Sequence, residues 1–390
     1  MGAERQEQGI IERMDYYHGF LPKDDAEVLV NDEHDDGTFL VRQWYRGGHE
    51  EIVLTMRWQN DIMHVVVTIS YNGYFGVGRL RFETVHDLIA HYWYRNRTDH
   101  FMVGVGRLPR LLHPVPRPKW NLLPEFLSLE CKMAAGSLGD VWQARLKRPT
   151  DQEAKTVAVK VCPADASPLV RARYMNACRN ARDLRHNNLC ACLGVQCLLR
   201  SLQLVLELAP QGSLPLFYQR NPGQISSAQK LCFCVDAARA VNHLADNGLI
   251  HGALAAKNCL VKERSIPESP QLVAPHSLIV SAAPELLCGD NRMATGGSDV
   301  WSLAVLLWEI LEDCQVPYPS VNGPAELSEL LNAGERLKLS AAVPKELQAL
   351  LSNCWHLDMK KRPPASLIMT EIESFINSKF DSQSPPTPSN

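Results

Sequence analysis

The feature that most constrains the fold is residues 251–261, His-Gly-Ala-Leu-Ala-Ala-Lys-Asn-Cys-Leu-Val. The segment before it, 226–247, has apolar residues at the spacing of an amphipathic helix. Its last residues, 259–261, are an apolar run typical of a buried strand. The sequence here therefore predicts a long helix, a short loop and a strand in direct succession.

This stretch resembles the catalytic loop of protein tyrosine kinases, whose pattern is H-R-D-L-A-A-R-N-C-L-V. The positions that match are His251, Leu254, Ala255, Ala256, Asn258, Cys259, Leu260 and Val261. Gly252 stands where the pattern has Arg, and Ala253 stands where it has the catalytic Asp. In kinases that Asp accepts or orients the proton of the attacking hydroxyl, and an alanine side chain has no lone pair to do so. The resemblance therefore predicts a kinase scaffold with no catalytic residue at this position.

Two motifs nearer the N-terminus resemble the nucleotide site of the same family. The segment 133–141 follows the pattern G-x-G-x-x-G-x-V with Ala134 in place of the first Gly, and 157–160 match V-A-I-K. Glycines let backbone amides approach phosphates closely, and the lysine is expected on the phosphate-facing side of its strand. Residues 202–208 resemble the strand that enters the hinge, whose backbone would hydrogen-bond a purine. The resemblance thus implies a candidate ATP site made of Gly136, Gly139, Val141, Lys160, Glu207 and Ala209.

Three departures weaken the case for phosphate transfer. The predicted helix 166–182 contains no acidic residue, and Ala177 stands where the family has the Glu that pairs with the lysine. Between Val261 and Pro284 there is no Asp to hold magnesium and no Tyr to be phosphorylated. Asn258 remains as a lone metal ligand, and one carboxamide is a poor magnesium site. We therefore expect no metal site.

The parts of the pattern that stabilise the large lobe are present. Residues 283–285 match A-P-E, residues 298–302 match the S-D-V-W-S start of a buried helix, and Arg362 matches the late Arg of the family. The resemblance predicts a buried ion pair between Glu285 and Arg362. Removing one partner of such a pair costs about 3–5 kcal/mol.

An N-terminal region, about 16–108, resembles the Src homology 2 (SH2) domain. Tyr-Tyr-His-Gly at 16–19 corresponds to W-Y-H-G, and 39–42 match F-L-V-R. A phosphotyrosine needs a planar fork of donors, which only Arg supplies, and the resemblance assigns this role to Arg42, with Lys23 and His64 on the pocket walls. The following loop, 43–48, lacks the Ser or Thr that the family uses for phosphate oxygens. Arg46 or the amides of Gly47 and Gly48 are candidate replacements.

The order of the motifs predicts the domain organisation and an α+β fold. We expect a disordered N-terminus at 1–15, an SH2 domain at 16–108, and a Pro-rich basic linker at 109–126 that Trp120 anchors on the next domain. A two-lobed kinase-like domain follows at 127–378, with its small lobe at 127–208 and its large lobe at 209–378, and then a disordered tail at 379–390. This order resembles the Fes/Fer group of non-receptor tyrosine kinases and implies a cytoplasmic signalling protein.

Composition narrows the partners. The formal net charge of −3 argues against a nucleic-acid or membrane-surface binder, and the longest apolar run, 303–308, is too short to span a bilayer. The twelve cysteines lack the spacing of zinc sites and are expected to be reduced thiols of the core and surface. The expected partners are phosphotyrosine-containing proteins, and an active kinase is a further candidate.

Three hypotheses follow. The first is a binding protein that docks on phosphotyrosine and uses its kinase-like domain as a scaffold or allosteric partner, with no required cofactor. The second is an active tyrosine kinase that uses surrogate acids, for which Glu263 and Glu268 are candidates near the missing metal strand. The third is binding of ATP without transfer and without a need for magnesium.

Overall fold

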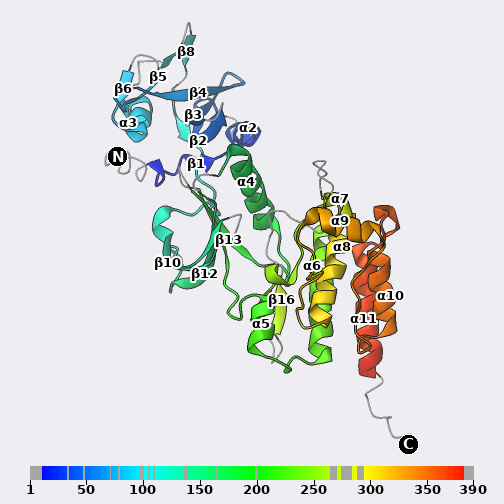
Figure 1. The fold of residues 1–390 in the computed structure, drawn as a ribbon. Helices are drawn as coiled ribbons and strands as arrows, with labels where there is room; N and C mark the ends of the chain where they lie inside the picture. The colour runs from blue at the N-terminus through cyan, green and yellow to red at the C-terminus, as the bar shows by residue number, and fades with distance from the viewer. Residues whose placement is uncertain are drawn as a thin grey trace, which may run out of the picture. The chain divides into compact units, whose positions relative to one another are not determined.

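The computed structural model describes residues 11–32, 35–46, 49–70, 72–77, 80–95, 101–103, 106–108, 110–135, 139–163, 166–197, 201–263, 270–273, 283–287 and 294–381. The chain divides into two compact units (Figure 1). The first unit comprises Met1–Arg182 and Cys192–Glu207, and the second comprises Asp183–Ala191 and Leu208–Asn390. Sheets dominate the first unit and helices the second, which confirms the predicted α+β class.

A twisted sheet forms the centre of the SH2-like part of the first unit. Its strands in spatial order are β1 (Tyr17–Phe20), β2 (Thr38–Arg46), β3 (His49–Trp58), β4 (Asp61–Ile69), β5 (Phe75–Val77) and β6 (Leu80–Phe82). A short strand, β9 (His113–Pro114), also pairs with β2, and both β1 and β9 run parallel to it. Because side chains alternate along a strand, Phe39 and Val41 of β2 enter one core while Leu40 enters another.

One helix packs in each of these two cores. In α2 (Lys23–Asp32), Ala26 and Val30 are fully buried with Leu40. In α3 (Val85–Ala90), the apolar residues pack with Phe39, and the hydroxyl of Thr84 caps the helix by accepting the backbone N–H of Asp87 at 2.9 Å. A π-helical turn, His91–Arg95, continues α3, and the hairpin β7 (Phe101–Val103) and β8 (Gly106–Leu108) follows. A sheet with two helices is the predicted SH2 arrangement.

The borders of this domain differ from two expectations. Residues 11–15 were expected to be disordered, but Ile11 is only 2% exposed and packs in the core with α3. The linker was expected to begin at 109, but Leu111 and Val115 are buried in the two cores of the domain and flank β9. The physical reason is the same in both places. A few apolar side chains fill a core, while the polar or Pro-rich residues around them do not predict this burial. Residues 1–10 lie outside the described part of the chain.

Trp120 anchors the end of the linker, as predicted. Its carbonyl oxygen accepts the backbone N–H of Val195 at 2.8 Å, and the guanidinium of Arg182 lies 5.1 Å from the centre of its ring. The backbone N–H of Leu122 donates to the carbonyl of Val195 at 2.7 Å. The linker is therefore tied to the small lobe by both backbone and side-chain contacts.

The small lobe is an antiparallel sheet in the order β10 (Leu127–Ala134), β11 (Asp140–Leu146), β12 (Lys155–Val161), β14 (Leu202–Glu207) and β13 (Cys192–Cys197). A 3-10 turn, Pro124–Phe126, precedes it, and the predicted helix is α4 (Pro168–Asp183). Ala144, Val157, Val159 and Val205 form its core. The glycine-rich segment lies between β10 and β11, as predicted.

The second unit is mainly helical. Its elements are α5 (Leu214–Arg220), α6 (Ser227–Asp246), the 3-10 turn Ala256–Asn258, β15 (Leu260–Glu263), β16 (Pro270–Val273), α7 (Pro284–Leu287), α8 (Gly296–Leu311), α9 (Pro324–Asn332), α10 (Lys345–Cys354), the 3-10 turn Met359–Lys361 and α11 (Ala365–Asp381). The central helix α6 packs against both α8 and α11 (Figure 1). The predicted helix, loop and strand at 226–261 are confirmed. Helix α11 extends into the segment 379–381, which was expected to begin the disordered tail.

Candidate functional site

The side chain of Arg42 lies in β2 and is only 3% exposed. Its Nε donates to the hydroxyl of Thr55 at 3.0 Å, its Nη1 donates to the carbonyl of Leu21 at 3.0 Å, and its Nη2 lies 3.5 Å from Nδ1 of His64. A guanidinium carries five N–H groups. These contacts, counted over the described residues, leave one N–H on each terminal nitrogen. A free N–H on each terminal nitrogen allows a guanidinium to bind a pair of phosphate or carboxylate oxygens.

The buried charge of Arg42 has no ion-pair partner among the described residues. Burial lowers the pKa of Arg42 to about 10, so the group stays protonated at neutral pH. Its guanidinium also lies 5.8 Å from the ring centre of Trp44, which stacks on Phe20. A buried cation that retains free donors favours the binding of an anion.

Lys23 and His64 meet on one carboxylate. Nζ of Lys23 lies 3.4 Å and Nε2 of His64 lies 3.0 Å from the same oxygen, Oε1 of Glu27. The other ring nitrogen of His64, Nδ1, is 3.1 Å from the hydroxyl of Thr55. The three residues that the sequence assigned to the phosphotyrosine pocket are thus joined through Glu27 and Thr55.

Sequence reasoning missed Glu27 and Thr55. Glu27 lies four residues after Lys23 on a predicted helix, a spacing at which opposite charges pair, so this signal was available. Thr55 shows no such signal, because it reaches the site only through the register that pairs it with His64 across β3 and β4. It supplies a hydroxyl that the loop sequence lacks. Gly47, Gly48 and the side chain of Arg46 lie outside what the structure describes.

The loop that resembles the kinase catalytic loop is held by two buried acids of α8. Oδ2 and Oδ1 of Asp299 accept the backbone N–H groups of His251 at 2.6 Å and Gly252 at 2.8 Å. Oε2 of Glu309 accepts the backbone N–H of Ala256 at 2.8 Å. The loop backbone is therefore fixed in place by the core beneath it.

At the position of the catalytic Asp, this loop has no side chain that can accept a proton. Ala253 is 4% exposed and presents a methyl group. Nδ2 of Asn258 donates to the carbonyl oxygen of Ala253 at 2.8 Å. Burial raises the pKa of Asp299, and it raises the pKa of Glu309 to about 7. Both acids accept backbone hydrogen bonds, which oppose this rise, so burial accounts for the raised pKa values. Glu263 ends β15, and Glu268 lies outside the described residues.

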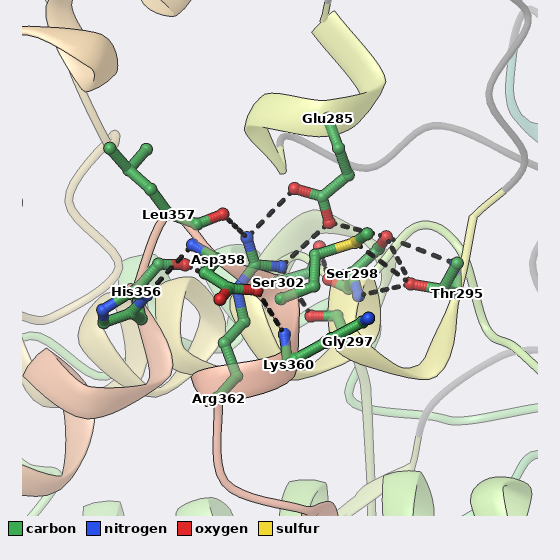
Figure 2. A network of polar contacts seen from close by, with 11 residues as sticks. Glu285, Thr295, Gly297, Ser298, Ser302, His356, Leu357, Asp358, Lys360 and Arg362 are labelled. Atoms are coloured by element: carbon green, nitrogen blue, oxygen red, sulfur yellow. Dashed lines mark hydrogen bonds and ion pairs between the residues drawn. The ribbon is translucent and has the colours of Figure 1, made fainter.

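The predicted ion pair between Glu285 and Arg362 is confirmed (Figure 2). Nη1 and Nη2 of Arg362 donate to Oε1 and Oε2 of Glu285 at 2.8 and 3.0 Å, a bidentate geometry. The hydroxyl of Ser298 donates to Oε1 of Glu285 at 2.8 Å. Thr295 caps α8 beside this pair through a reciprocal capping box with Ser298. The network joins α7, the start of α8 and the segment before α11.

In the small lobe, Lys160 lies in β12 and pairs in register with Val141 of β11 and Leu204 of β14. Burial lowers the pKa of Lys160, and among the described residues it has no ion pair. Ala177, at the expected Glu position, lies in α4 and is half-buried. The lysine therefore lacks the acid that orients it in the family pattern.

The other candidate nucleotide residues are only partly described. Gly139 has φ +114°, and a Cβ there would lie 1.9 Å from the carbonyl oxygen of Val161, so only glycine fits. Gly136 lies outside the described residues. Glu207 ends β14 in the first unit, and Ala209 is buried in the second.

Comparison with known families supports both domains. The profile of the protein tyrosine and serine/threonine kinase family matches residues 127–269 and 276–372. The SH2 domain profile matches residues 16–92. The chain is thus an SH2-containing, kinase-like protein, and it belongs to the protein tyrosine and serine/threonine kinase family.

Relatives of this chain include Fer and Fps tyrosine kinases. Human tyrosine-protein kinase Fer is 27% identical over 373 residues, which cover 92% of this chain and 43% of Fer. Fer-related kinase 1 of Caenorhabditis elegans is 26% identical over 386 residues, 95% of each chain. The transforming protein Fps of avian sarcoma virus (strain PRCII) is 27% identical over 372 residues, 92% of this chain and 67% of Fps. This chain therefore spans less than half the length of human Fer.

Two negative findings apply to the described residues. None of their helices is both long and apolar enough to cross a membrane. Their His, Cys, Asp and Glu side chains form no group of three or more that could hold a metal ion. Every cysteine among them is a free thiol, and most are buried, as expected for core thiols.

Proposed function

We propose that this chain is a phosphotyrosine-binding signalling protein. Its kinase-like domain acts as a scaffold or allosteric partner and does not transfer phosphate. Its partners are phosphotyrosine-containing proteins in the cytoplasm, with an active kinase as a candidate among them. It requires no cofactor. The observation that carries this proposal is the buried Arg42, which among the described residues has no ion-pair partner and keeps a free N–H on each terminal nitrogen.

Three features of the kinase-like domain support the absence of transfer. Ala253 occupies the position of the catalytic Asp, Ala177 that of the helix Glu, and residues 262–283 contain no Asp. The backbone around Ala253 is nevertheless fixed by Asp299. What the loop lacks is therefore the carboxylate, while its support is retained.

The alternative is an active tyrosine kinase with unorthodox residues. In its favour, the relatives are named tyrosine-protein kinases, and Lys160 is present. It needs Glu263 or Glu268 to hold magnesium, some other group to orient the substrate hydroxyl, and a substitute for the helix Glu that is missing at Ala177. Three coordinated replacements are needed at once, so the binding protein is the better supported proposal.

Transfer of radiolabelled phosphate from ATP tests the choice. The full-length chain is assayed on itself and on a tyrosine-containing polymer beside a Lys160→Met variant, which reveals contaminating kinase. We expect no transfer above that control. Transfer that Lys160→Met abolishes would refute the scaffold proposal, and Glu263 and Glu268 would be changed next.

Nucleotide binding without transfer is a separate question. Lys160 and Gly139 favour it, because the lysine supplies a charge and the glycine a close backbone approach. A thermal-shift titration with ATP, with and without magnesium, separates a nucleotide-binding domain from an empty one. We expect that any stabilisation does not depend on magnesium, since Asn258 is the only metal ligand retained from the family pattern.

Phosphotyrosine binding is tested with a mixed phosphotyrosine peptide library. Arg42→Ala is expected to lose binding, because no other residue type supplies the planar fork. The matched control is Arg145→Ala, which removes a half-exposed arginine of the small lobe that pairs with Glu130. Equal binding by the Arg42→Ala variant and the wild type would remove the basis of the proposal.

A further inference from the structure

Glu27 is an acid in a place where phosphate is expected to bind. One oxygen of its carboxylate contacts both Lys23 and His64, at 3.4 and 3.0 Å. These are the two residues that the SH2 resemblance assigns to the pocket walls. The contact with Lys23 alone would be an ordinary pair at i and i+4 on a helix, which contributes little. The contact with His64 has no such local explanation, because the two residues are 37 positions apart and belong to α2 and β4.

The hydrogen-bond partners define a direction through this site. Arg42 can only donate, so its Nε–H points at the oxygen of Thr55. The hydroxyl of Thr55 is then free to donate to Nδ1 of His64, 3.1 Å away. Nδ1 of His64 also faces Nη2 of Arg42 at 3.5 Å, and two donors at one nitrogen require that it accept. The proton of neutral His64 therefore resides on Nε2 and points at Glu27.

These hydrogen bonds direct the donor groups of Lys23 and His64 to Glu27. The Nε2–H of His64 and the ammonium of Lys23 both face its carboxylate rather than a ligand. The hydrogen bond from His64, with help from Lys23, lowers the pKa of Glu27, so the group is ionised at neutral pH. A phosphotyrosine carries about −1.5 to −2 charges and needs the same donors.

We infer that Glu27 is an internal competitor for the phosphate of phosphotyrosine, an acidic latch that lowers the affinity of the pocket until a ligand displaces it. This inference rests on the proposed phosphotyrosine binding. When the latch is closed, the negative charge of Glu27 offsets the positive charge of Lys23 and leaves Arg42 to attract the ligand. When a phosphate enters, Lys23 and His64 turn from the carboxylate to the phosphate oxygens.

The test titrates phenyl phosphate and phenyl sulfate into the full-length chain. In Glu27→Gln, phenyl phosphate is expected to bind about tenfold tighter than in the wild type, since charged hydrogen bonds are released to the ligand. Phenyl sulfate, with one negative charge, is expected to gain less, because Glu27 repels a single charge less strongly than a double one. A general loosening of the pocket would change the two affinities alike.

Asp24→Asn is the matched control. It removes the same charge from an exposed acid of the same helix, for which the structure shows no contact with Lys23 or His64. It is expected to change the affinity less than twofold. An equal gain in both variants would reduce the effect to net charge and overturn the latch, as would an unchanged or weaker affinity in Glu27→Gln.

The double variant Arg42→Ala with Glu27→Gln separates the two proposals. If Glu27→Gln gains affinity and the double variant loses it, the gain acts through the Arg42 pocket and the latch is supported. If the wild type and Asp24→Asn bind phenyl phosphate but Glu27→Gln gains nothing, only the latch fails. If the folded wild type and Glu27→Gln bind neither phenyl phosphate nor the mixed phosphopeptide library, the proposal of phosphotyrosine binding fails and the latch fails with it.

Discussion

The pocket around Arg42 and the loop around Ala253 both resemble sites that handle phosphate, and they differ in which parts remain. In the pocket, the residues that the SH2 resemblance assigns to phosphate binding lie together, and Glu27 contacts two of them. In the loop, the acids that hold the backbone are present, and the side chain at the reacting position is a methyl group. The comparison shows that the support of a site and its chemistry depend on different residues and can be kept or lost separately.

The largest effect is expected in the large lobe, at the ion pair of Glu285 and Arg362. Glu285→Ala removes the ion-pair partner of the buried guanidinium of Arg362, which is expected to cost about 3–5 kcal/mol of large-lobe stability. Hydrogen exchange of the amides of α8 measures this loss. The control is Glu371→Ala, an exposed acid on α11. A loss below about 1 kcal/mol would show that the scaffold does not depend on this pair.

The next effect is a pH dependence at Glu309. Its folded pKa, about 7, lies above the ordinary value of 4.5, so its contribution to stability is complete below 4.5 and is lost as the pH rises to about 7. The difference between the folded and ordinary pKa values corresponds to at most about 3 kcal/mol of unfolding free energy. Urea unfolding at pH 5 and pH 8 is compared for the wild type and Glu309→Gln, which stays neutral. The free energy of unfolding of the wild type is expected to fall relative to that of Glu309→Gln between pH 5 and pH 8. A difference that stays constant would contradict the raised pKa.

A smaller effect is expected in the pocket at Thr55. Thr55→Val removes the hydroxyl that joins Arg42 to His64 and leaves the shape nearly unchanged. Binding of the mixed phosphotyrosine peptides is expected to weaken about tenfold, the value of one charged hydrogen bond. Thr68→Val serves as the control, since that hydroxyl donates to the carbonyl of Gly76. Unchanged binding in Thr55→Val would mean that the side chain of Arg42 keeps its binding orientation without this hydrogen bond.

The smallest expected change is none. Ala253→Asp places the family carboxylate on a backbone that Asp299 already holds. Because no acid at the metal position is restored with it, we expect no phosphate transfer in the radiolabel assay. Transfer by this single variant would show that the loop lacks only one group. The loop and the Arg42 pocket would then differ less in completeness than we propose.

The sequence alone predicted much of this molecule. Motifs with strict spacing identified the two domains, and they placed Arg42 in the candidate pocket and paired Glu285 with Arg362 across 77 positions. The burial of α8 followed from the match of residues 298–302 to the family pattern. These predictions succeeded because a motif carries its structural context with it, and because local periodicity reports the burial of a helix or a strand.

The tertiary structure decided the rest. Glu27 reaches His64, and Thr55 reaches Arg42, only because β2, β3 and β4 pair in one particular register beside α2. Ile11 and Leu111 enter the SH2 core although the sequence predicted disorder and a linker for their segments. Such contacts join residues far apart in the chain, and the free energy that fixes them comes from packing and register, which no local pattern of residues records.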